Sequence, residues 1–162
     1  QTAGLIMNRM VFVSSVIAGL AVSATACRQP STPAYTPGLG EIMTLTQMRH
    51  SKLWFAGEAG NWPLASYELD ELHEGMDDAV TFHPTHKDSP LPIPDLIQKI
   101  MTEPLRQLED AIKAKDQARF AQAFDAVTEG CNACHRAANF GFNVVTRPTT
   151  NPYSNQAFPP TP

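Results

Sequence analysis

Residues 116–139 read DQARFAQAFDAVTEGCNACHRAAN. Apolar side chains and two cysteines recur in this stretch every three or four residues, which is the spacing of one face of an α-helix. The recurring positions are Phe120, Phe124, Val127, Cys131, Cys134 and Ala138. The pattern predicts an amphipathic helix that places both sulfur atoms on the side facing the core.

The second half of this helix contains Cys131-Asn132-Ala133-Cys134-His135, which matches the C-x-x-C-H sequence at which c-type haem is attached. Two thiols one helical turn apart can add to the two vinyl groups of haem, and the adjacent imidazole can then bind the iron. If three cysteines and five histidines were placed at random in 162 residues, such a pentapeptide would arise roughly 0.002 times. The motif therefore predicts one covalently attached haem c.

Two other uses of paired cysteines remain as alternatives. A thioredoxin-like C-x-x-C follows a strand and begins a helix, and no strand-like segment precedes Cys131. A zinc site would need two further ligands, and His83 and His86 are the only candidate pair. Those two histidines lie in a proline-rich segment, and their order relative to the cysteines matches no common zinc spacing.

Two further helices are expected near the start of the domain. Residues 41–60 mix apolar and polar side chains without proline, and Asn61 is expected to cap a second helix. Trp62-Pro63 would form its first turn, where proline costs no hydrogen bond. The apolar stripe of the second helix comprises Trp62, Ala65, Leu69, Leu72, Met76 and Ala79. Its other side is acidic, which is typical of a solvated face. The acidic residues are Glu68, Asp70, Glu71, Glu74, Asp77 and Asp78.

A loop and another helix separate these from the cysteine-bearing helix. Residues 83–94 contain four prolines and predict a loop, and the next helical pattern covers residues 95–114. Pro104 should kink that helix or restart it with Thr102 as the cap. No segment alternates over the length of a strand. The sequence thus predicts an all-α fold, an antiparallel four-helix bundle over residues 41–146 with haem near the C-terminal end of the fourth helix.

The first 27 residues predict export from the cytoplasm. Arg9 is the only charged residue among them, and residues 10–22 form an apolar run as long as a signal-peptide core. Residues 24–26 (Ala-Thr-Ala) fit the cleavage rule, and with Cys27 they resemble a bacterial lipobox. We therefore expect a periplasmic protein. Cys27 either carries a lipid that tethers the protein to a membrane or merely lies near the cleavage point, and a retained N-terminal anchor is the third alternative.

Proline-rich segments flank the predicted domain. Residues 28–40 contain three prolines and two glycines and predict an extended tether. Residues 147–162 contain five prolines and no hydrophobic period, so we expect a disordered tail. The alternative for this tail is a strap across the domain surface that carries Phe158.

The charge balance restricts the class of partner. Twelve Lys and Arg against sixteen Asp and Glu give a net charge of −4, and loss of Arg9 by cleavage would make it −5. This acidic balance argues against a nucleic-acid partner. It favours a redox partner with a basic docking patch, which would associate faster at low salt.

Four helices with the C-x-x-C-H motif near the end of the last one resemble the class II c-type cytochromes. This family comprises cytochrome c prime and its low-spin, methionine-ligated relatives, and the resemblance covers about residues 38–145. It implies that Cys131 and Cys134 carry the haem thioethers, that His135 is the proximal ligand, and that the first helix faces the distal side. It is also compatible with a homodimer, because relatives often dimerise, although the sequence specifies no interface.

The distal ligand determines what the haem can do. The resemblance implies either a methionine on the iron, early in the first helix, or an apolar residue that leaves the iron five-coordinate. Met43, Gln47, His50 and Trp54 share one face at spacings of 4, 3 and 4. We predict that Met43 binds the iron and that Gln47 and His50 lie near the propionates or the haem edge. The alternatives are His50, Met48 or no sixth ligand.

Each alternative implies a function. An iron held by His135 and Met43 is coordinatively saturated, which suits outer-sphere electron transfer. A five-coordinate iron would instead bind small gases such as nitric oxide or carbon monoxide. Peroxidase-like catalysis needs distal acid–base groups, and only His50 and Gln47 are available, so we do not expect an enzyme. We predict a monohaem c-type cytochrome that carries single electrons between partners outside the cytoplasmic membrane. We also expect Phe124 to contact the haem.

Overall fold

The computed structural model describes residues 35–161. Its helices are α1 (Leu39–Glu58), α2 (Trp62–Phe82), α3 (Ile93–Ile100), α4 (Thr102–Ala114) and α5 (Gln117–Ala137). Within the described residues no strand occurs, so the all-α prediction is confirmed. The predicted export signal, Cys27 and most of the tether lie outside the described residues.

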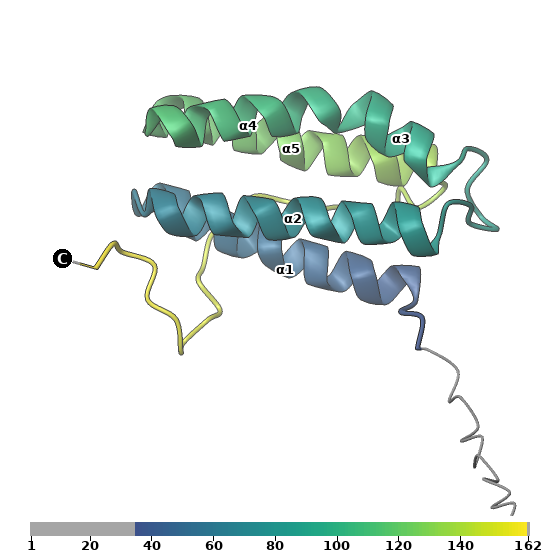
Figure 1. Cartoon of the computed structure of the whole chain (residues 1–162), viewed down its shortest axis with the longest axis horizontal. Coiled ribbons are helices and arrows are strands. Elements are labelled where there is room, and N and C mark those ends of the chain that lie inside the picture. The colour runs from purple at the N-terminus through teal and green to yellow at the C-terminus, as the bar shows by residue number, and fades with distance from the viewer. Residues whose placement is uncertain (1–34, 162) are drawn as a thin grey trace, which may run out of the picture. The chain divides into compact units, whose positions relative to one another are not determined.

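The helices pack in two layers (Figure 1). α1 packs along α2 in one layer, and α4 packs along α5 in the other, with α3 extending beyond α4 at the same end as the loop after α2. Helices that follow one another along the chain are therefore neighbours in space, as expected for short connections.

Two predicted helix starts are confirmed by their caps. The Asn61 side-chain oxygen accepts a hydrogen bond from the Leu64 amide at 3.3 Å, as predicted for the start of α2. The Asp116 carboxylate accepts from the amides of Ala118 and Arg119 at 3.1 and 3.0 Å. Both caps satisfy amide groups that the first turn of a helix leaves without a partner.

The tether is shorter than predicted. Leu39 and Gly40 belong to the first turn of α1, because the amides of Glu41 and Ile42 already donate to the Gly38 carbonyl at 3.0 and 3.1 Å. The predicted boundary at residue 40 was wrong because Gly40 was counted with the proline-rich segment.

The third predicted helix is interrupted, as its proline suggested, but at a different residue. Met101 separates α3 from α4, three residues before Pro104. Thr102 is the first residue of α4 and not its cap, since its hydroxyl donates back to the Gln98 carbonyl at 2.7 Å. The interruption lets α3 and α4 contact different parts of the domain.

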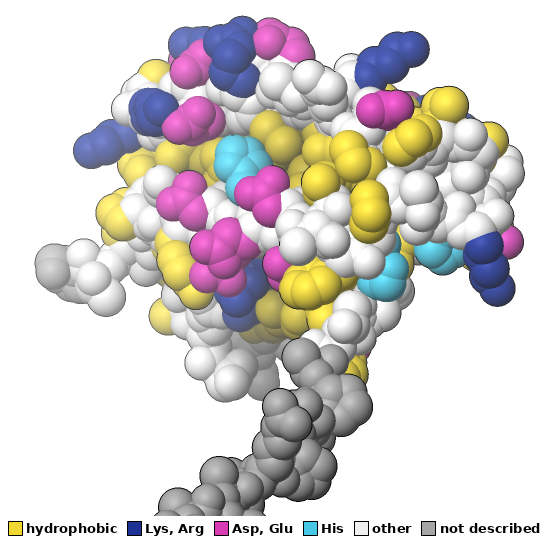
Figure 2. All heavy atoms as spheres, turned by 45° about the vertical axis from the view of Figure 1, so that its right-hand side comes forward, with side chains coloured by type: hydrophobic (Ala, Val, Ile, Leu, Met, Phe, Trp, Pro, Cys, Tyr) yellow, Lys and Arg dark blue, Asp and Glu magenta, His cyan; other side chains and the backbone are white. Residues whose placement is uncertain are grey.

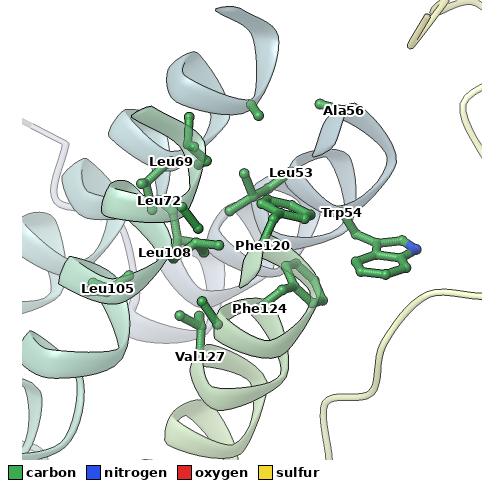
Figure 3. Packing of buried hydrophobic residues seen from close by; sticks show 14 of the residues in the cluster. Leu53, Trp54, Ala56, Leu69, Leu72, Leu105, Leu108, Phe120, Phe124 and Val127 are labelled. Carbon is green, nitrogen blue, oxygen red and sulfur yellow. The ribbon is translucent and has the colours of Figure 1, made fainter. Parts of the chain in front are cut away.

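Both layers contribute to one hydrophobic core (Figure 3). Leucines of α1, α2 and α4 surround the aromatic rings of α5. The labelled members are Leu53, Trp54, Ala56, Leu69, Leu72, Leu105, Leu108, Phe120, Phe124 and Val127. At Gly57 the backbone of α1 lies so close to Phe120 that an added Cβ atom would stand 2.0 Å from the ring. α1 and α5 are therefore packed without spare room in this half of the domain.

The C-terminal tail is a strap. Phe158 is only 5% exposed, and its ring lies 5.5 Å from that of Phe55 and 6.2 Å from that of Tyr153. The Asn61 amide donates to the Phe158 carbonyl at 2.9 Å, and the Tyr153 hydroxyl donates to the Met48 carbonyl at 3.3 Å. The expectation of a disordered tail is wrong for these residues, because buried aromatic side chains and side-chain hydrogen bonds fix the segment.

One carboxylate of the acidic side of α2 is buried. Glu68 is 1% exposed, and the Arg49 guanidinium of α1 lies 3.3 Å from its carboxylate and 2.7 Å from that of Glu71. Burial raises the pKa of Glu68, and the Arg49 charge acts in the opposite direction. Interpreting Glu68 as part of a solvated face was therefore wrong, because its partner comes from another helix.

We expect Arg49→Met to lower the free energy of unfolding by about 3 kcal/mol, because it leaves the Glu68 carboxylate buried without its counter-charge. Adding Glu68→Gln should recover part of that loss. Urea denaturation measures both changes. The control is Arg106→Met, which breaks an exposed cluster with Glu103 and Asp110 and should change stability little. Equal losses in Arg49→Met and Arg106→Met would contradict the expectation.

Candidate functional site

A cavity of about 380 Å³ lies among α1, α2, α3 and the C-terminal end of α5. This volume is in the range of about 300–1,000 Å³ that is usual for small-molecule and cofactor sites. Its walls are mostly apolar. The apolar residues that line it are Leu39, Met43, Met76, Ala79, Ile93, Leu96, Ile97, Met101, Ala138, Phe140 and Phe142.

The two cysteines and the histidine of the C-x-x-C-H motif line this cavity. Cys131 and Cys134 are partly buried free thiols one turn apart on α5, and His135 follows in the last turn. Met43 lines the same cavity from α1. The structure thus brings together the four residues that the sequence assigned to thioether bonds and iron ligation.

The surroundings of the cysteines favour neutral thiols. Burial raises the pKa of Cys131 to about 12 and also raises the pKa of Cys134. A thioredoxin-like cysteine pair requires the opposite shift, because its reactive form is the thiolate. Two neutral thiols in an apolar cavity thus do not favour the thioredoxin-like alternative.

The two histidines considered for a zinc site contact different parts of the protein. His83 Nε2 donates to the Pro37 carbonyl at 2.8 Å. His86 lines the cavity beside the cysteines, with its ring 5.4 Å from Phe140. Among residues 35–161, no three His, Cys, Asp or Glu side chains form a group suited to a metal ion.

His135 is held in one tautomer. Its Nδ1 lies 2.6 Å from the Asn143 carbonyl oxygen, and because a carbonyl only accepts, Nδ1 must carry the proton. The other ring nitrogen, Nε2, then keeps its lone pair. Metal-binding histidines usually have this arrangement, with the far ring nitrogen donating to a carbonyl or carboxylate.

His50 lies at the boundary between the site and the core. It is 3% exposed, and its Nε2 lies 2.8 Å from the Thr128 hydroxyl. That hydroxyl donates its only hydrogen to the Phe124 carbonyl at 2.9 Å, so His50 Nε2 is the donor of the pair. Burial lowers the pKa of His50 to about 4, which keeps the ring neutral at pH 7.

The other predicted site residues are distributed around the cavity and the core. Gln47 and His50 line a smaller adjoining cavity of about 130 Å³, which Met43 also lines. Phe124 is fully buried in the core, with its ring 4.4 Å from that of His50, and lines neither cavity. Met48 lines neither cavity as well.

Sequence reasoning missed several residues of the cavity wall. Met76 was expected only to pack in the core, but it also lines the cavity, as does Met101. Helical periodicity could not distinguish the two roles, because a cavity wall and a core share the same apolar face. The polar lining residues Thr46 and Asn143 carried no signal in the sequence.

No known protein family matches this chain, and neither a curated protein nor a solved structure matches it. None of the helices in the described part of the chain is long and apolar enough to cross a membrane. Function is therefore inferred from the residues that line the cavity.

We expect stability to depend on the protonation of His50. Its pKa is about 4 in the folded protein and about 6.5 in an unfolded chain, so the unfolded state binds the proton more tightly. Stability should therefore fall as the pH drops from about 6.5 to about 4, by about 3 kcal/mol in total. Chemical denaturation across this range measures the loss. His50→Gln should lack this part of the pH dependence, and equal slopes in both proteins would count against it.

Proposed function

We propose that this protein is a monohaem c-type cytochrome that transfers single electrons between redox partners. The observation that carries the proposal is that Cys131, Cys134 and His135 line one apolar cavity while His135 keeps Nε2 free for iron. The C-x-x-C-H motif alone would be compatible with any fold. Its position on the wall of a cofactor-sized cavity supports haem attachment specifically.

The residues around the cavity fit a haem. The two thiols that line the cavity are one helical turn apart, and the walls of the cavity are apolar. The imidazole of His135 has the tautomer that binds a metal. Haem, when bound, supplies an iron that alternates between the ferric and ferrous states. Cys131 and Cys134 would hold it covalently, His135 would bind the iron, and the apolar walls would exclude water.

The helix arrangement is compatible with the fold implied by the class II cytochromes. If α3 and α4 are taken as one interrupted helix, residues 35–161 contain four helical rods, and neighbours in sequence pack together. We propose that these rods form an antiparallel four-helix bundle, with haem near the C-terminal end of α5. A homodimer is part of the same family-based proposal.

Met43 is the proposed sixth ligand. Its thioether comes from a different helix than His135 and lines both cavities. A methionine opposite a histidine stabilises ferrous iron and raises the reduction potential, which suits an electron carrier. Met48, the alternative on the same helix, lines neither cavity.

Met43→Ala should convert a low-spin haem protein into a high-spin one that binds carbon monoxide, because it removes the sixth ligand. Visible spectra of the oxidised and reduced protein, with and without carbon monoxide, measure this change. Met48→Ala is the matched control and should keep the wild-type spectrum. If the wild-type protein is already high-spin and binds the gas, the electron-transfer proposal fails and gas binding replaces it.

An acidic groove adjoins the haem cavity. It has a volume of about 150 Å³ and is lined by four carboxylates, those of Glu41, Glu71, Glu74 and Asp78, together with Arg49. Thr46 lines both the groove and the cavity. Figure 2 shows acidic side chains gathered on one face of the molecule, and a redox partner with a basic patch would be attracted to such a face.

We place this electron transfer in the periplasm, with membrane tethering through the N-terminal region.

The rate of electron transfer to a cationic reagent should fall as salt is added. Stopped-flow oxidation of the reduced protein by tris(phenanthroline)cobalt(III) measures this rate. The double variant Glu74→Gln/Asp78→Asn should show a weaker salt dependence. Glu103→Gln/Asp110→Asn makes the same charge change on α4, away from the groove, and should keep the wild-type dependence. Rates that do not change with ionic strength would argue against an electrostatic docking surface.

A further inference from the structure

The carbonyl that holds His135 belongs to a segment without regular structure. The chain turns after α5, where the Phe140 amide donates to the His135 carbonyl at 2.7 Å and the Asn143 amide donates to the Phe140 carbonyl at 2.8 Å. Asn143 itself is exposed. A carbonyl in such a segment can orient an imidazole only if the segment is fixed by other contacts.

Asn132 provides such a contact through two hydrogen bonds to one residue. Its Nδ2 donates to the Val145 carbonyl at 2.9 Å, and its Oδ1 accepts from the Val145 amide at 2.8 Å. The Val145 side chain is buried. An amide side chain is suited to this pairing because it offers a donor and an acceptor side by side, whereas Asp lacks the donor.

Arg147 anchors the same segment two residues further along. Its Nε donates to the Asp125 carboxylate at 2.9 Å, and its guanidinium carbon lies 4.3 Å from the centre of the Trp54 ring. With Val145 and Arg147 both tied to the helices, the backbone from Asn143 onward has a defined path beside α5.

We propose that Asn132, a variable position of the C-x-x-C-H motif, is a positioning residue for the proximal histidine. The inference rests on the haem attachment proposed above. Asn132 fixes Val145, which holds the Asn143 carbonyl at His135 Nδ1. A maintained Nδ1–H···O=C bond makes the imidazole a stronger electron donor to a metal. The stronger donor favours ferric iron, so Asn132 lowers the reduction potential.

Asn132→Ala tests this role. The variant keeps Cys131, Cys134 and His135, so haem attachment should persist. We expect the equilibrium constant for reduction to rise about tenfold, which is about 59 mV for a one-electron couple. Spectroelectrochemistry of the haem-loaded protein measures the potential. Hydrogen exchange of the Val145 amide, followed by NMR, is an independent readout and should become faster.

The matched control is Asn139→Gly. Asn139 lies four residues after the motif, and its side chain donates to the Asp88 carbonyl at 2.9 Å and not to Asn143 or Val145. Its φ of 67° is one that glycine adopts without strain. Asn139→Gly should therefore lose only the hydrogen bond to Asp88 and leave the potential unchanged, which separates positioning from the loss of any hydrogen bond near the motif.

The outcomes distinguish this inference from the proposed function. A wild-type protein without covalent haem would overturn both. A haem-loaded wild type whose potential and Val145 exchange are unchanged by Asn132→Ala would overturn the positioning role alone. If Asn132→Ala does not accumulate with haem, Asn132→Ser, which removes the paired contact but keeps a polar group, is judged by the same criteria.

Discussion

One face of α5 fills the core in its first half and lines a cavity in its second half. In the first half the packing is close, since Phe120 lies directly against the α1 backbone at Gly57. In the second half smaller side chains, those of Cys131 and Cys134, replace the aromatic rings on the same stripe. Because protein interiors otherwise pack without voids, this change of side-chain size along one helix determines where the cavity forms.

The interruption between α3 and α4 complements that change. α4 contributes Leu105 and Leu108 to the core, whereas α3 contributes Leu96 to the cavity wall. Met101 stands at the junction and lies so close to Gly130 that a Cβ atom there would approach its sulfur to 2.6 Å. Met101 thus lines the cavity at the interruption between α3 and α4, and a residue larger than glycine at position 130 would displace its side chain.

The features that could be predicted from the sequence are the local ones. Helices follow from periodicity, the start of α2 follows from the Asn61 cap, and the C-x-x-C-H motif occupies five consecutive residues. The burial of Glu68 could not be predicted, because it depends on a guanidinium from another helix. Nor could the pairing of Asn132 with Val145, since it depends on segments that meet only in the folded chain. A strap carrying Phe158 was only the alternative for the tail, because its partner Asn61 lies 97 residues away. Periodicity also could not tell a cavity wall from a core, because both require apolar residues on the same face.

The strap formed by the tail has a consequence for the order of folding. The contact between Asn61 and Phe158 joins the turn between α1 and α2 to a residue 97 positions further along the chain. A chain synthesised from its N-terminus cannot complete this contact until Phe158 has been added. Contacts of such long range form late, because the loop that they close is costly in entropy. The C-x-x-C-H motif precedes Phe158 in the chain, so all five helices are synthesised before the turn between α1 and α2 can be covered.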